Sequence, residues 1–234
     1  LKALGYRFLD EKGEDAGEGG QALAKIARID VSGMNPLLKE CHIQVACDVN
    51  NPLCGENGST YVYGPQKGVT ENQKKQLDED MAHFAQITSQ ALGTDYCNTP
   101  GAGAAGGLGF AFLSYLGATL TPGIELILNA VGLEQELSDA DVVVTGEGRL
   151  DSQTVMGKAP VGIASLAKKY NKKVIAFCGC AADDAMLCNT YGIDAYFPIL
   201  QKPVSLEEAM DPAVAGQNLK KTAEQVFRLL TCSA

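Results

Sequence analysis

The feature that most constrains the fold is an alternation of strand-like and helix-like segments in residues 139–234. Short runs of β-branched and apolar residues are each followed by a longer segment with apolar residues at helical spacing. The strand–helix pairs are Val142–Thr145 with Val155–Tyr170, Lys173–Cys178 with Ala181–Tyr191, and Asp194–Pro198 with Pro212–Leu230. This alternation predicts an α/β fold, with a parallel sheet and helices on its faces.

The first 138 residues lack this regular rhythm and predict a second, mixed α/β domain. The acidic segment Ser138–Asp141 is the expected boundary, giving domains 1–138 and 139–234. The first domain is expected to contain strands over Tyr6–Leu9 and His42–Asp48, the latter buried, and helices over Gln21–Arg28, Thr70–Leu92, Leu108–Leu116 and Pro122–Val131.

Composition excludes several classes of partner. The net charge of -9 and the pI near 4.7 argue against nucleic acid and against an anionic membrane surface. No apolar run approaches the ~18 residues that a membrane span needs, and no secretory signal is visible. None of the eight cysteines forms a Cys-x-x-Cys pair. We therefore expect reduced, mostly buried thiols, without disulfides or zinc, in a cytoplasmic protein, and leave open whether it is a homo-oligomer.

The stretch Asp141–Thr154 concentrates polar residues after a strand. The strand is expected to stop at Gly146 and Gly148, so that a tight loop carries Glu147, Arg149, Asp151, Ser152 and Thr154. Ligands of open α/β sheets bind at the carboxyl ends of strands. Two carboxylates and a guanidinium there suit a metal, a phosphate or a small acid. The alternative is a solvated loop whose Asp and Ser cap the next helix.

A second strand end also carries polar groups. The expected strand His42–Asp48 delivers Asp48 into a loop with Asn50 and Asn51, whose oxygens suit a hydroxyl or a metal. The alternative is an Asx turn ahead of Pro52, and the sequence favours neither.

The glycine-rich run Pro100–Gly109 precedes an apolar helix. A glycine loop that opens a helix presents backbone N–H groups to an anion, so Gly101, Gly103, Gly106 and Gly107 are candidate phosphate contacts. The alternative is close packing through small residues. A dinucleotide-binding fold is excluded because no strand precedes the motif. Lys67, between Pro65 and Gly68, is placed to meet a phosphate or is simply a surface lysine.

Together these segments resemble the bacterial glycerate kinase family, whose members phosphorylate D-glycerate with ATP. The matching runs, in family order and spacing, are Ala46–Gly55, Tyr63–Gly68, Pro100–Gly109, Thr145–Thr154 and Gly157–Pro160. The resemblance implies two α/β domains, one of them flavodoxin-like and built from N- and C-terminal chain segments, with the active site between them. The family's N-terminal portion is not found in this sequence, so an incomplete enzyme is expected.

Phosphoryl transfer assigns roles to these residues, because it needs mainly positioning and charge stabilisation. We expect Asp48 to be the base for the acceptor hydroxyl, with Arg149 and Lys67 as further catalytic residues. Glu147 and Asp151 are expected to hold Mg²⁺. The remaining candidates for binding substrate or phosphate are Asn50, Asn51, Gly101, Gly103, Gly106, Gly107, Ser152 and Thr154. The expected product is 2-phosphoglycerate. The alternative function is a non-catalytic module that binds a small acid or phosphate.

Overall fold

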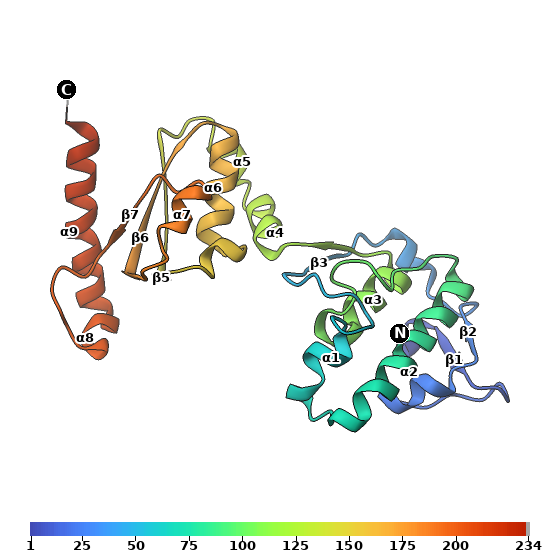
Figure 1. Ribbon diagram of the computed structural model, residues 1–234. Helices are drawn as coiled ribbons and strands as arrows, with labels where there is room; N and C mark the ends of the chain where they lie inside the picture. The colour runs from blue at the N-terminus through green and yellow to red at the C-terminus, as the bar shows by residue number, and fades with distance from the viewer. Residues whose placement is uncertain (233–234) are drawn as a thin grey trace. The chain divides into compact units, whose positions relative to one another are not determined.

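The predicted parallel sheet is present in the second half of the chain. In the computed structural model, which describes residues 1–232, three strands lie side by side in the order β5, β6, β7, all parallel (Figure 1). Their bounds are Val142–Leu150, Lys173–Ala181 and Ala195–Pro198. The predicted α/β fold class is thereby confirmed.

The chain divides into two compact units, Leu1–Gly123 and the part that begins at Ile124. The sequence placed a domain boundary further along the chain, at residue 138, and that assignment remains a prediction.

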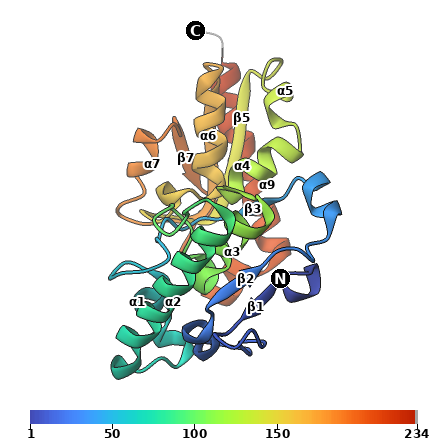
Figure 2. The same cartoon turned by 90° about the vertical axis from the view of Figure 1, so that its right-hand side faces the viewer.

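Side chains alternate across β6, so that this strand contributes to two apolar layers of the second unit. Val174, Ala176 and Cys178 pack with Ala164 of α6 (Ala159–Lys169) in one buried cluster. Ile175 and Phe177 pack instead with Val226 of α9 (Pro212–Thr231). Helices therefore cover both faces of the sheet, as Figures 1 and 2 show.

The second unit also contains several short helices. They are α4 (Gly123–Ala130, which starts at the last residue of the first unit), α5 (Leu133–Glu136), the 3-10 helix η5 (Thr154–Met156), α7 (Leu187–Thr190) and α8 (Leu206–Met210). The helix expected from Val155 begins only at Ala159, because Gly157 has a φ of 98° and ends η5. The helix expected over Ala181–Tyr191 is reduced to α7, and α8 was not predicted.

The first unit combines two small sheets with three α-helices. β1 (Arg7–Leu9) pairs with β2 (Arg28–Asp30) antiparallel, and β3 (Gln44–Ala46) pairs with β4 (Thr119–Thr121) parallel. The helices are α1 (Ser59–Tyr63), α2 (Glu71–Leu92) and α3 (Ala104–Leu116), and the 3-10 helices are η1 (Lys2–Leu4), η2 (Gly20–Lys25), η3 (Pro36–Glu40) and η4 (Pro65–Lys67).

An aromatic cluster forms the centre of the first unit. Tyr6 and Tyr115 meet edge to face with ring centroids 5.2 Å apart, and Phe84 of α2 contacts Phe110 of α3. The long helix α2 was predicted correctly, and its start is fixed by the Thr70 N–H, which donates to the Gln73 side chain at 3.0 Å.

Two predictions for the first unit are wrong. The helix expected over Gln21–Arg28 is η2, because Ala27 N–H donates to Leu9 O at 2.8 Å and Arg28 already belongs to β2. The strand expected over His42–Asp48 was predicted to be buried. The observed strand β3 is exposed at Gln44 and Ala46, because it belongs to a sheet of two strands, β3 and β4.

The burial of the cysteines differs from the prediction. All eight cysteines are unpaired in the described chain, but only Cys178 and Cys188 are buried, so the prediction that most are buried is wrong. Burial raises the pKa of the Cys178 thiol to about 11. Within residues 1–232, no helix is long and apolar enough to cross a membrane.

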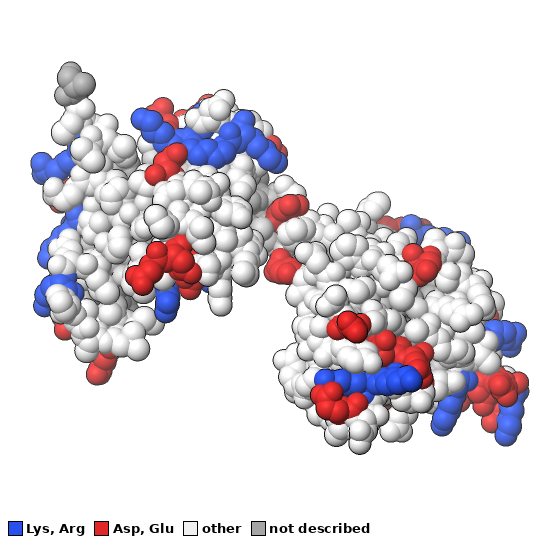
Figure 3. All heavy atoms as spheres, viewed as in Figure 1, with Lys and Arg blue, Asp and Glu red and all other residues white. Residues whose placement is uncertain are grey.

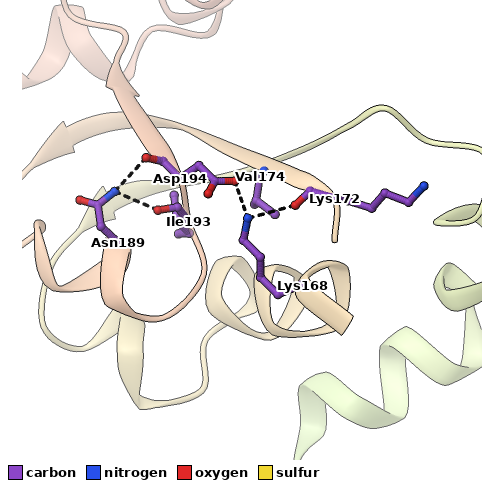
Figure 4. Close-up of polar contacts among 6 residues, drawn as sticks. All are labelled: Lys168, Lys172, Val174, Asn189, Ile193 and Asp194. Carbon is purple, nitrogen blue, oxygen red and sulfur yellow. Dashed lines mark hydrogen bonds and ion pairs between the residues drawn. The ribbon is translucent and has the colours of Figure 1, made fainter. Parts of the chain in front are cut away.

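Asp194 joins the start of β6 to the end of α6 (Figure 4). Its Oδ2 accepts hydrogen bonds from Lys168 Nζ at 2.6 Å and from the N–H of buried Val174 at 2.7 Å. Asn189 holds the neighbouring carbonyl oxygen of Ile193 at 2.8 Å. These contacts lie at the amino ends of β6 and β7, so we assign them a structural role.

We expect Asp194→Ala to lower the free energy of unfolding at pH 7 by about 1–3 kcal/mol, because the buried Val174 N–H loses its acceptor. Hydrogen bonding to Lys168 lowers the pKa of Asp194 below its ordinary 3.8. This contribution is therefore complete above that value and is lost as the pH falls through the folded-state pKa. Urea melts from pH 7 to pH 2.5 should show the difference from wild type shrinking, whereas Asp183→Ala, an exposed control, should change little. A difference that is constant with pH would contradict this role.

Candidate active site

The strand β5 continues through the segment in which a loop was predicted. Glu147 pairs with Cys178 and Arg149 with Cys180 of β6, so both charged residues lie on the strand and not in a turn. A Cβ at Gly146 would collide with the carbonyl oxygen of Phe177. Gly146 therefore permits close strand pairing, and the turn predicted at Gly146 and Gly148 is wrong because β5 stays paired with β6 as far as Leu150.

The turn comes instead after Leu150 and is organised by Thr154. The Thr154 side chain is 0% exposed, and its hydroxyl donates to Glu147 Oε1 while accepting the Asp151 N–H at 3.2 Å. Asp151 Oδ1 also accepts the Gln153 N–H at 3.0 Å. Thr154 was predicted to contact substrate or phosphate. Because its side chain has no exposed surface, the structure gives it a positioning role between the two carboxylates.

Two cations lie beside Asp151. Arg149 Nε is 3.5 Å from Asp151 Oδ2, and Lys158 Nζ is 3.9 Å from Asp151 Oδ1. The Arg149 side chain is 65% exposed, and ion pairs this long and exposed are weak. Both cations can therefore turn toward a bound anion at little cost. In Figure 3, acidic and basic side chains gather at the end of the second unit where β5 finishes.

Asp184, in the segment after β6, lies near Ser152 and Arg149. It was not among the site residues predicted from the sequence. Hydrogen bonding with Ser152 lowers the pKa of Asp184 below its ordinary 3.8, and the charge of Arg149 makes a smaller contribution in the same direction. Its Oδ1 is buried and has no hydrogen-bond partner within residues 1–232. A signal was available, because Asp183 and Asp184 closely follow an expected strand just as Asp151 does. Ser152, a predicted binding residue, lies beside Asp184.

The carboxylates of Glu147 and Asp151 suit a hard cation that takes few ligands from the protein. Glu147 and Asp151 are linked through Thr154, but residues 1–232 contain no group of three or more His, Cys, Asp or Glu side chains arranged to hold a metal. Mg²⁺ usually takes one or two carboxylates and completes its shell with water and substrate phosphates. The pair therefore fits Mg²⁺ bound together with a nucleotide, and does not fit a closed zinc site.

A cavity in the second unit lies apart from most of these charges. It measures about 770 Å³ and lies between the β5–β6 face and helices α8 and α9. Its walls are mainly apolar, with Val144, Phe177, Leu219 and Phe227 among them, and Glu147 is its one carboxylate. Apart from Glu147, the charged residues of the candidate site therefore lie outside this cavity, near the ends of the strands.

In the first unit, Asp48 is exposed and its Oδ1 accepts the N–H of Gly123 at 2.8 Å. The Asn51 side chain is occupied within its own loop, since it donates to Asn57 O at 2.8 Å and accepts from Tyr63 OH at 2.7 Å. Asn50 is exposed and available to a ligand. The Asp48 side chain is thus oriented by Gly123, which is distant in sequence, and not by an Asx turn.

The glycine run packs tightly against the Asn51 loop. A Cβ at Gly103 would lie 3.1 Å from Asn51 O, and one at Gly101 would lie 2.8 Å from the Cys47 sulfur. The N–H groups of Gly103, Gly106 and Gly107 donate to chain carbonyls at 2.9, 3.1 and 3.4 Å. These contacts favour the packing alternative. Phosphate binding by Gly101, Gly103, Gly106 and Gly107 stays a prediction.

We expect Thr154→Val to break the link between Glu147 and Asp151. Loss of the hydroxyl leaves the Asp151 N–H without its acceptor and Glu147 without its donor, which should cost about 1–3 kcal/mol in the free energy of unfolding. Thr154→Ser should restore most of this stability, because it keeps the hydroxyl. Chemical denaturation of the three proteins measures the effect. Equal stability of Thr154→Val and wild type would rule out the positioning role.

Comparison with known proteins places this geometry in a family. The model of the glycerate kinase family matches residues 1–231. The chain belongs to the glycerate kinase family. Among glycerate kinases, the one of Bacillus subtilis (strain 168) is 46% identical over 226 residues, which are 97% of this chain and 59% of the relative. The glycerate 2-kinase of Escherichia coli (strain K12) is 46% identical over 209 residues, 89% of this chain and 55% of the relative.

A solved structure shows the same fold. The crystal structure of a protein assigned as glycerate kinase 2 of Salmonella typhimurium LT2 superposes with a TM-score of 0.80 at 41% identity, covering 97% of this chain and 60% of that one. This glycerate kinase family chain thus spans less than two thirds of the length of the relatives it matches. The family resemblance predicted from the motifs is confirmed.

Proposed function

We propose that this protein is an ATP-dependent glycerate kinase, which transfers the γ-phosphoryl group of ATP to the C2 hydroxyl of D-glycerate and gives 2-phosphoglycerate and ADP. Membership of the glycerate kinase family supports the proposal, and the name of the Escherichia coli relative, a glycerate 2-kinase, supports the choice of hydroxyl. The observation that carries it is the charged group at the carboxyl ends of β5 and β6, where Glu147, Arg149 and Asp151 meet.

Phosphoryl transfer places three demands on a protein: neutralisation of phosphate charge, positioning of the acceptor, and removal of the hydroxyl proton. The Arg149 guanidinium is exposed and lightly paired, so it can form two hydrogen bonds to phosphate oxygens. Glu147 and Asp151 would hold Mg²⁺, which when bound neutralises charge on the nucleotide phosphates. Ser152 and Lys158 provide further donors beside them.

Asp48 is the proposed base. Its carboxylate is exposed and oriented by the Gly123 N–H, which leaves its second oxygen available to the acceptor. As the hydroxyl proton passes to Asp48, the acceptor oxygen bonds to the γ-phosphorus, and the bond from that phosphorus to the bridging oxygen of ADP breaks. Asn50 lies two residues away, with its side chain exposed to orient the acceptor. A cytoplasmic location and the oligomeric state stay predictions.

An acceptor panel tests this function. ADP release should depend on D-glycerate and should be slow with L-glycerate, D-lactate or glycerol, each of which lacks one feature of the acceptor. NMR of the purified product should place the phosphate on C2. Binding of D-glycerate and ATP without any ADP release would support the alternative, a non-catalytic binding module.

A further inference from the structure

Asp184 has a buried carboxylate oxygen and lies outside the set of residues assigned to phosphoryl transfer. It belongs to the segment between β6 and α7, which is tied to the end of β5 because the Ala182 N–H donates to Leu150 O at 2.9 Å. Asp184 Oδ1 makes no hydrogen bond within residues 1–232. A buried carboxylate oxygen without a donor is destabilising, so this atom favours a rearrangement that brings a donor to it.

Asp184 lies in the same region as the two carboxylates proposed to hold Mg²⁺. Burial raises the pKa of the Cys188 thiol, which is 0% exposed, and three nearby negative charges raise it further. These charges belong to Glu147, Asp151 and Asp184. Arg149 of β5 lies close enough for its positive charge to act on Asp184. A cationic donor for Asp184 Oδ1 is therefore present on a neighbouring strand.

Arg149 can leave its present partner, Asp151. Its Nε is 3.5 Å from Asp151 Oδ2 and its side chain is 65% exposed, so this ion pair is weak. When Asp151 holds Mg²⁺, the metal offsets the negative charge of the carboxylate and repels the guanidinium. A guanidinium has five N–H donors in a rigid fork, so one edge can bind a carboxylate while the other binds a phosphate. Asp184 can provide that carboxylate.

We propose that Asp184 is the positioning residue for Arg149 when Mg²⁺ and ATP are bound. The guanidinium moves from Asp151 to Asp184 Oδ1 and is thereby fixed with its other edge toward the nucleotide phosphates. This inference rests on the proposed function, because that function gives Arg149 a phosphate to bind. It also accounts for the unsatisfied Oδ1, which accepts a guanidinium N–H in the new arrangement. Hydrogen bonding with Ser152, the main cause of the lowered pKa of Asp184, keeps the carboxylate ionised for this role.

The test is a double-mutant cycle on nucleotide binding, measured by calorimetric titration with ATP and Mg²⁺ in the absence of glycerate. Arg149→Met should weaken ATP binding about tenfold or more, because charged hydrogen bonds to phosphate are lost. Asp184→Asn keeps the shape of the side chain but removes its charge, and should weaken binding about three- to tenfold. The double variant should bind as Arg149→Met does, because Asp184 acts through Arg149. Asp183→Asn, which changes the exposed neighbour, should bind as wild type does.

Three results would overturn this role of Asp184. The first is additive losses in the double variant, and the second is wild-type affinity in an Asp184→Asn variant that urea denaturation shows to be folded. The third is coupling of Asp184→Asn with Ser152→Ala but not with Arg149→Met, because Asp184 would then support only the turn that contains Ser152.

The binding cycle needs no turnover, so its failure is distinguishable from failure of the kinase proposal. Wild-type protein that binds ATP with Mg²⁺ but releases no ADP with D-glycerate would contradict the kinase proposal, and the cycle would still test Asp184. Additive losses in a protein that phosphorylates D-glycerate would contradict the role of Asp184 alone. No saturable binding of ATP to wild type would overturn both.

Discussion

Asp48→Asn should lower kcat by about 10²–10⁴-fold, with no recovery at high Mg²⁺, because a positioned base that is lost cannot be replaced by metal. The substitution keeps an oxygen that can accept the Gly123 N–H, which Asp48 now binds at 2.8 Å. The local structure should therefore survive, and steady-state kinetics over a range of Mg²⁺ concentrations should report the chemistry alone.

Asp95→Asn is the matched control for this experiment. Asp95 is also an exposed loop carboxylate of the first unit that accepts one backbone N–H, that of Cys97 at 2.8 Å. Its variant should keep near wild-type turnover. If Asp48→Asn melts several degrees lower yet turns over normally per folded molecule, the Asp48 carboxylate is structural and another group removes the proton.

Asp151→Asn should lower activity by about 10²-fold or more, with partial recovery at high Mg²⁺, because a group that supports a metal site mainly affects metal affinity. The amide oxygen can still accept the Gln153 N–H, now 3.0 Å from Asp151 Oδ1. The negative charge between Arg149 and Lys158 is lost, so an effect on metal and phosphate binding is expected. The apparent affinity for Mg²⁺, measured from the kinetics, is the informative quantity.

Asp141→Asn provides the comparison, because Asp141 is an exposed residue next to the opposite end of β5. It should change neither kcat nor the Mg²⁺ dependence. An Asp151→Asn enzyme with unchanged Mg²⁺ dependence and normal turnover would remove Asp151 from the metal site. A loss of activity that no Mg²⁺ concentration relieves would instead assign Asp151 to orienting Arg149.

The sequence predicted the elements whose signals are local. Thr70 begins α2, because an N-cap acts within the first helical turn. The parallel sheet followed from the strand–helix alternation, since few other topologies bury such strands. Regular helical geometry in α3 starts near Leu108, because Ala105 has a φ of 51° and the two glycines that follow also have positive φ.

The wrong predictions share a physical cause, which is pairing between segments distant in sequence. Glycine permits a turn but also permits an extended strand, and only the pairing of Glu147 with Cys178 shows which one occurs. Likewise, Arg28 pairs with Leu9 and cannot remain helical. The burial of Thr154 could not be predicted either, because it depends on the packing of the whole turn, and its predicted contact with substrate or phosphate stays a prediction. Asp184 was missed because a helix was expected over the segment that contains it.

The most direct test of the proposed function is ³¹P NMR of the protein with ATP, Mg²⁺ and D-glycerate. We expect the γ-phosphate signal to fall while one phosphate monoester signal and ADP rise in equal amounts, with D-glycerate required for the change. Release of inorganic phosphate with no monoester, or an unchanged ATP spectrum in the presence of folded protein, would contradict phosphoryl transfer to glycerate.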